Sequence, residues 1–381
     1  MKNGVVLYVD RFPSHLASVA VLVGVGPLYE EKERRGATHL LEHMLFHIPN
    51  FDIDAAVETL GGEANAFTYR DALVIIIETL AESARGAVEL AYRIYTNSNF
   101  HVGDLEKEKA IVLSELRQSR EDPAERVAEL AVGALFGDSD WGAPVGGRPE
   151  AIEAIELEDL LSHKERWFTP DNTIVALSGG VDEGAIKTAV ELFGKLEGVA
   201  PGKKKPTASR GPPRVVERRD VDGVYYAYAA EVQTDRPVDT YIQLAAASFH
   251  LGDGAKSILF QLLRNRGISY SYHVEFDVVG DTAYILTAVE SATGLQEARE
   301  AVLEALRPRE PPQYRLTFFK YLWSRRSPST RALEAAEFLN KGGDPAQLDA
   351  SMWRAVQEGT LWLMPKIRRS VEAIIAPEKL I

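Results

Sequence analysis

The segment GGEANAFTYRDALVIIIETL, residues 61–80, predicts two β-strands joined by a polar turn at residues 70–71. An amphipathic helix, SARGAVELAYRIYT, is expected next, over residues 83–96. Two further strands, around residues 4–9 and 17–24, are expected before this unit. Paired strands followed by a helix indicate an α+β layer rather than a βαβ array, because the strands are joined by a short turn.

The second half of the chain repeats this order. A strand at residues 223–232 and a helix at 238–251 precede ISYSYHVEFDVVGDTAYILTAVE, residues 268–290, which again has two strands around a Gly-Asp turn. A helix over residues 294–306 follows. The repetition predicts an internal duplication. The expected fold class is therefore α+β, with two tandem, structurally similar domains, each a mainly antiparallel sheet packed against helices.

The clearest break in the chain is the segment GVAPGKKKPTASRGPP, residues 198–213. It is rich in Pro, Gly and Lys and lacks hydrophobic periodicity, as expected for a linker. The predicted domains are therefore residues 1–197 and residues 214–381.

Composition limits the classes of function. Of 381 residues, 45% are hydrophobic and 26% charged, which is ordinary for a globular protein. No window approaches the ~18 apolar residues of a membrane span, and the N-terminus reads as a strand rather than a signal peptide. A net charge of −13 disfavours nucleic acid and anionic membranes as partners. We therefore expect a cytoplasmic protein.

The chain has no cysteine, so disulfides, thiol nucleophiles and thiolate metal sites are excluded. Any bound metal must be held by His, Asp or Glu.

The short segment THLLEHMLFH, residues 38–47, is the strongest candidate for chemistry. It predicts a helix over residues 37–46, with Thr38 as N-cap and Pro49 ending the run. Its apolar residues surround the helix on nearly all sides, so the helix should be buried. Buried histidine and glutamate side chains need partners, since an unpaired polar group costs a few kcal/mol.

Within this helix His39 and His43 are one turn apart on one face, with Glu42 beside them. Two such imidazoles can bind one Zn²⁺, and the glutamate can activate the water bound to it. His-x-x-Glu-His is the inverted form of the zinc-protease helix motif, although histidines so spaced can also be satisfied by backbone or carboxylate groups. His47 lies about 12 Å along the axis from His39, too far to share its ion, and is expected to be structural or solvent-facing.

A third ligand is expected from the helix DLEKEKAIVLSELRQSRED, residues 104–122. Glu108 and Glu115 lie two turns apart on one face that also carries apolar residues. Carboxylates on an apolar stripe are unusual unless paired or metal-bound, although a solvated helix face is the alternative.

Three motifs in this order resemble the pitrilysin and mitochondrial processing peptidase family of inverted-motif zinc proteases: GATHLLEHMLFH, GGEANAFT and LEKEKAIVLSEL. RWFTPDNTIVALSGGVD, residues 166–182, is similar to the strand that closes that family's first domain. The interval between the histidines and Glu115 is a few residues shorter than in the family, which a clipped loop at residues 47–53 would explain.

The resemblance implies roles for individual residues. The ligands of one Zn²⁺ per chain would be His39, His43 and Glu115, and the general base would be Glu42. Glu108 matches a second carboxylate of the catalytic site, which orients the ligands without binding the ion. The first domain would thus carry the zinc site.

The resemblance also implies substrate contacts. The strand ANAFT would receive an extended peptide, with Asn65 and Ala66 as contacts. SILFQLLRNRGISYSY, residues 257–272, is similar to a stretch of the family's second, non-metal-binding domain, where an arginine and a tyrosine contact substrate. Here these are Arg264 and Tyr270, at a spacing one residue shorter than usual. His250 stands alone and is expected to be a core or surface residue.

The sequence therefore predicts a zinc metalloendopeptidase acting on peptides or unfolded segments. In the resemblance, two-domain members pair to enclose a chamber, so a homodimer is expected, or a heterodimer with a related subunit. The alternatives are a non-catalytic or partner-dependent subunit of a larger assembly, and a metal-dependent hydrolase of a non-peptide substrate.

Overall fold

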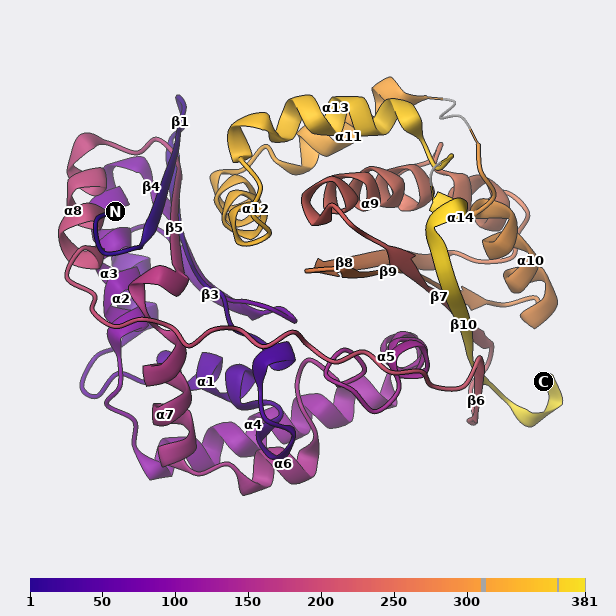
Figure 1. Cartoon of the computed structure of the whole chain (residues 1–381), viewed down its shortest axis with the longest axis horizontal. Helices are drawn as coiled ribbons and strands as arrows, with labels where there is room; N and C mark the ends of the chain where they lie inside the picture. Colours follow the sequence, from indigo (N-terminus) through magenta and orange to yellow (C-terminus); the bar gives the residue numbers. More distant parts are fainter. Residues whose placement is uncertain (310–312, 362, 381) are drawn as a thin grey trace. The chain divides into compact units, whose positions relative to one another are not determined.

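The computed structural model describes residues 1–309, 313–361 and 363–380. The chain forms two compact units (Figure 1), each built from non-contiguous segments. Unit 1 contains Met1–Leu116, Ala143–Pro206 and Ser324–Asn340, and unit 2 contains Arg117–Gly142, Thr207–Trp323 and Lys341–Ile381. No helix among the described residues is both long enough and apolar enough to cross a membrane.

Unit 1 is built on a five-stranded sheet of order β1-β5-β2-β4-β3. Only β1 and β5 run parallel, and the other neighbours pair antiparallel. β3 is an edge strand, and the predicted hairpin forms with β3 paired to β4. The strands are β1 (Val6–Arg11), β2 (Leu16–Val23), β3 (Glu63–Thr68), β4 (Leu73–Leu80) and β5 (Thr173–Gly179).

Helices cover both faces of this sheet. Alternate residues of β2 face two separate cores, one with α3 and α8 and the other with α12, and Figure 1 shows α12 on the opposite side of the sheet from α3 and α8. The helices are α1 (Ala37–Leu45), α2 (Ile53–Thr59), α3 (Ala84–Thr96), α4 (Val102–Glu121, in unit 2 from Arg117 onward), α6 (Pro149–Ala154), α7 (Leu157–Trp167), α8 (Glu183–Phe193) and α12 (Pro328–Asn340).

Unit 2 repeats this plan with a sheet of order β6-β10-β7-β9-β8, in which only β6 and β10 are parallel. Taken in chain order, its strands occupy the same places as those of unit 1. The predicted α+β fold with two similar domains is therefore confirmed. The strands are β6 (Arg214–Arg218), β7 (Val224–Gln233), β8 (Ser271–Val279), β9 (Thr282–Ser291) and β10 (Ile367–Ala376).

The main core of unit 2 lies between this sheet and helices α9 and α10, while α5 packs on β7, β9 and β10. The helices are α5 (Pro123–Phe136), α9 (Pro237–Gly252), the π-helix η5 (Phe260–Arg264), α10 (Leu295–Ala305), α11 (Tyr314–Ser324), α13 (Leu348–Glu358) and α14 (Leu363–Lys366).

Each unit takes one helix from the other half of the sequence. Helix α5, which precedes the Pro/Gly-rich segment, belongs to unit 2, and α12, which follows it, belongs to unit 1. Residues 201–212 of that segment form no helix or strand. An ion pair also holds α12 within unit 1, because Arg331 Nε lies 2.6 Å from Asp10 Oδ2 of β1.

Candidate metal centre

Helix α1 begins differently from the sequence expectation. Thr38 is not its N-cap: it is a fully buried residue of the first turn, and Gly36 occupies the N-cap position. The free N–H groups there are bound by a distant side chain, because the Glu30 carboxylate accepts from Gly36 N at 2.7 Å and Thr38 N at 2.6 Å. The partial positive charge at a helix N-terminus also stabilises a carboxylate placed there.

Close packing fixes the start of α1. Gly36 has φ of 106°, which residues with a Cβ rarely adopt, and a Cβ there would also lie 3.0 Å from the backbone oxygen of Gly146. Thr38 Oγ1 lies 3.1 Å from His163 Nε2 of α7. The apolar residues Leu40, Leu41, Met44 and Leu45 are fully buried. The polar residues of α1 are thus carried on a rigid element.

His39 and His43 of α1 and Glu115 of α4 come together at one point. Glu115 Oε2 lies 3.7 Å from His39 Nε2 and 3.6 Å from His43 Nε2. Within the described parts of the chain, these residues form the one group of three His, Asp or Glu side chains whose ligand atoms all lie within 4.8 Å. Both imidazoles are largely buried, with 20% and 18% of their side chains exposed.

The geometry of this group fits a zinc ion. Bonds of about 2.0–2.2 Å in a tetrahedron place neighbouring ligand atoms about 3.3–3.6 Å apart. The distances of 3.6 and 3.7 Å are close to that value. Two neutral nitrogens and one carboxylate oxygen are a donor set typical of catalytic zinc, with a fourth position left open.

Glu42 lies beside this group, on the same helix. Its carboxylate accepts a hydrogen bond from Thr68 Oγ1, at the end of β3. Burial raises the pKa of Glu42 above 4.5, while Thr68 and a charged His43 lower it and Glu115 raises it. A raised pKa suits a group that must take up a proton and release it.

Glu108 bridges two histidines. Its Oε2 lies 2.8 Å from His43 Nδ1, and its Oε1 lies 2.7 Å from His47 Nε2. His47 is not one of the three residues whose ligand atoms converge, but the Glu108 carboxylate connects it to His43. Glu106, by contrast, is exposed and pairs with Lys109 at 3.0 Å.

Sequence reasoning missed Glu30 and Thr68. Glu30 begins the run EEKERR, residues 30–35, which resembles a solvated charged loop. Thr68 lies 26 residues from Glu42. Local pattern carries no signal for either contact, because each depends on pairing between segments distant in sequence.

The predicted substrate residues Asn65 and Ala66 lie on the edge strand β3. Asn65 is exposed, and its Oδ1 accepts from the N–H of Ala66 at 2.8 Å. Ala66 is buried, at 8% exposure. Their role in substrate binding stays a prediction.

Arg264 and Tyr270 lie together in unit 2. The Arg264 guanidinium carbon is 5.4 Å from the Tyr270 ring centroid and 5.3 Å from that of Phe260. Tyr270 is 76% exposed, so the pair offers a cationic and aromatic surface. Whether they bind substrate stays a prediction.

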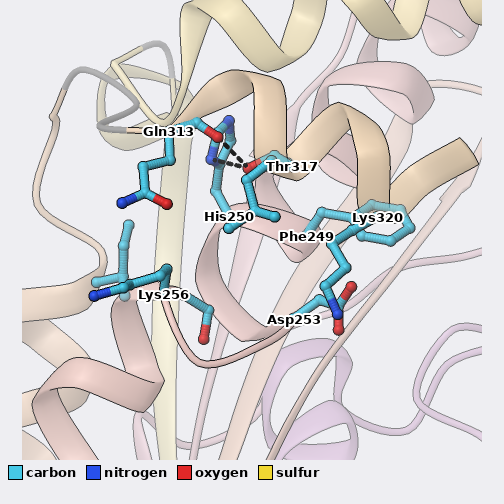
Figure 2. A pocket seen from close by; sticks show the side chains of 10 residues that line it. Phe249, His250, Asp253, Lys256, Gln313, Thr317 and Lys320 are labelled. Carbon is cyan, nitrogen blue, oxygen red and sulfur yellow. Dashed lines mark hydrogen bonds between the residues drawn. The ribbon is translucent and has the colours of Figure 1, made fainter. Parts of the chain in front are cut away.

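His250 is a core histidine of unit 2, as one of the two sequence expectations had it. Its Nε2 lies 2.8 Å from Val356 O and its Nδ1 3.1 Å from Thr317 Oγ1. Figure 2 shows it at a pocket lined also by Gln313, Lys256 and Lys320. Both nitrogens of His250 are thus engaged with protein groups.

Zinc-free protein should lose stability as the pH falls from about 6.5 to about 4. Burial, and next a charged His43, lower the pKa of His39 from 6.5 to about 4. The unfolded chain therefore binds this proton first, so stability is unaffected above pH 6.5 and falls below it. The shift corresponds to at most about 3 kcal/mol.

Urea unfolding at several pH values with a chelator present would measure this loss in wild type and in His39→Gln. The buried His163, whose pKa is also lowered to about 4, is common to both proteins and cancels in the difference. A variant whose stability falls in parallel with wild type across this range would contradict the assignment.

The site is a histidine–histidine–glutamate group on an inverted zinc-protease motif, within a duplicated α+β fold. Residues 5–147 match the model of the insulinase family, peptidase family M16, and residues 154–308 match the model described as the M16 inactive domain. The chain belongs to peptidase family M16.

Curated relatives carry names that agree with this site. An uncharacterized zinc protease of Mycobacterium leprae is 31% identical over 294 residues, 74% of this chain and 66% of that protein. The match thus spans just under two thirds of that relative. The uncharacterized zinc protease YmxG of Bacillus subtilis is 26% identical over 322 residues, 80% of this chain and 76% of that protein. These names imply zinc as the metal of the homologues.

Solved structures share the fold. The crystal structure of a protease from Helicobacter pylori matches with a TM-score of 0.84, at 20% identity, and covers 99% of this chain and 98% of that one. The M16 inactive domain from Pseudomonas fluorescens matches with a TM-score of 0.81, at 16% identity, over 98% and 95% of the two chains.

Proposed function

We propose that this chain is a zinc-dependent endopeptidase that hydrolyses peptides or unfolded segments. One observation carries the proposal: the ligand atoms of His39 and His43 on α1 and of Glu115 on α4 converge within 4.8 Å, and α1 also carries Glu42. The names of the curated relatives support the same reaction class. One ion per chain is proposed, since unit 2 offers no comparable group among its described residues.

The division of labour follows from the residues. His39, His43 and Glu115 would hold the ion, which supplies a Lewis acid that polarises the scissile carbonyl and lowers the pKa of a bound water. Glu42 removes a proton from the attacking water and later passes a proton to the leaving amine. Thr68 holds the Glu42 carboxylate in place through its hydroxyl. Glu108 fixes the ring of His43 through Nδ1.

The edge strand β3 is the proposed docking place for substrate. An extended peptide can add to a free sheet edge through backbone hydrogen bonds, which give affinity with little sequence preference. Asn65 would then release the Ala66 N–H that its side chain now binds. We also propose that the active form is a homodimer, or a heterodimer with a related subunit that supplies part of the substrate surface.

Metal removal tests the activity directly. Zinc-loaded chain incubated with a mixed peptide library should cleave peptides, as detected by mass spectrometry. The chelator-treated chain should not cleave peptides. Adding stoichiometric zinc should restore cleavage, because the proposed ligands come from protein side chains alone.

The second candidate is a non-catalytic or partner-dependent subunit. The match of residues 154–308 to a domain described as inactive favours keeping this alternative. Chain that binds one zinc yet cleaves no peptide would contradict the proposal for the isolated protein. Cleavage that returns on adding a related subunit would identify a heterodimer.

A further inference from the structure

We infer that His47 is a positioning residue of the metal centre, which acts on His43 through Glu108. This inference rests on the proposed function, since it concerns the same zinc site. The carboxylate of Glu108 lies between two histidines of one chain segment, with 2.8 Å to His43 Nδ1 and 2.7 Å to His47 Nε2.

His47 is itself held in place. Helix α1 ends at Leu45, and His47 N donates to Met44 O at 3.1 Å in the closing turn. The buried Asn97 then anchors this turn, because its Nδ2 donates to His47 O at 2.8 Å and to Leu45 O at 3.2 Å. The side chain of His47 is 35% exposed, so it combines a fixed backbone with partial access to solvent.

Glu108 needs two donors. Its side chain is only 9% exposed, and a buried carboxylate with an unpaired oxygen is costly. His43 supplies one donor to Oε2 and His47 the other to Oε1. With both oxygens engaged, the carboxylate cannot turn away from His43. Without His47, Oε1 of Glu108 would lose its protein donor and would need a hydrogen bond from water. The plane of the carboxylate would then no longer be fixed.

The position of the Glu108 carboxylate determines which nitrogen of His43 can bind the metal. A carboxylate only accepts, so the hydrogen bond to Glu108 places the proton of neutral His43 on Nδ1. The lone pair then lies on Nε2, the atom 3.6 Å from Glu115 Oε2. Partners of this kind set the tautomer and basicity of a ligand, and their loss typically costs about 10–100-fold in metal affinity.

The experiment is a zinc-affinity measurement on the full-length chain, by competition with a chromogenic chelator. We expect His47→Ala to weaken zinc binding by about tenfold, at the low end of that range. His47→Gln should bind nearly as wild type, because its amide can still donate to Glu108. His101→Ala, which removes an exposed histidine immediately before α4, is the matched control and should have no effect.

A double-mutant cycle tests the route. In a Glu108→Ala background, His47→Ala should cause no further loss, since the connecting carboxylate is gone. If His47→Ala fails to fold, the experiment uses His47→Leu instead, because leucine fills a similar space but cannot donate a hydrogen bond. Wild-type zinc affinity in folded His47→Ala or His47→Leu would overturn the inference, as would equal losses with and without Glu108.

The outcome separates this inference from the proposed activity. Weaker zinc binding in His47→Ala supports the positioning role even if wild type cleaves no peptide. Wild type that cleaves peptides and a His47→Ala variant with unchanged affinity would leave the activity standing and overturn the role of His47. Wild type that binds no zinc would overturn both.

Discussion

Glu42→Gln is expected to keep zinc and to lose peptide cleavage by at least about 100-fold, within the 10²–10⁴ range typical of a positioned acid–base group. The amide has the shape of the carboxylate and can still accept from Thr68 Oγ1, so the site should remain intact. It cannot accept the proton of the attacking water. A 100-fold loss corresponds to about 2.7 kcal/mol of transition-state stabilisation.

The measurement is kcat/KM on a peptide found in the library, alongside zinc stoichiometry for each protein. Thr68→Ala is the matched control: it removes the hydrogen bond to Glu42 but leaves the base, and should lose far less activity. Cleavage by Glu42→Gln within tenfold of wild type would contradict the assignment of Glu42 as the base.

The duplication could be predicted from the sequence because hairpins and helices are local. Two strands joined by a short turn predict their own pairing, and β3–β4 and β8–β9 both form as expected. The exchange of α5 and α12 was not predicted. An amphipathic pattern tells that a helix has an apolar face, but not which sheet receives it.

The sequence of strand β2, LASVAVLV, did indicate that a helix covers each face of the sheet. Seven of its eight residues are buried, with no alternation between apolar and polar. A strand buried on both faces requires cover on both. Ala332, Ala335 and Ala336 of α12 supply that cover against Ala20 and Leu22, and their small side chains allow close approach.

The candidate site, too, could be predicted from the sequence only in part. The i, i+4 spacing of His39 and His43 follows from helix geometry, and the seven-residue spacing of Glu108 and Glu115 places both on one face of α4. That α1 and α4 bring these faces together came from the family resemblance. The contacts of Glu30 and His47 follow from tertiary packing, which no spacing rule encodes.

Glu115→Gln is expected to weaken zinc binding by more than about 100-fold, the upper end for partners that do not touch the metal. It replaces a charged oxygen ligand by a neutral amide, while the histidine pair remains. Because 45% of the Glu115 side chain is exposed, the fold of the zinc-free protein should be unaffected. Thermal unfolding with and without zinc separates these effects.

At zinc 100 times the wild-type Kd, binding stabilises wild type by about 2.7 kcal/mol, whereas Glu115→Gln should gain well under 1 kcal/mol at that concentration. Glu106→Gln provides the control on the same helix. Glu106 is exposed and is not one of the three residues whose ligand atoms converge, so the change should leave zinc stabilisation intact. Equal zinc stabilisation of Glu115→Gln and wild type would remove Glu115 from the ligand set. The two histidines would then need a third ligand from elsewhere, and Glu42 would become the carboxylate to test, because it lies on the same helix beside them.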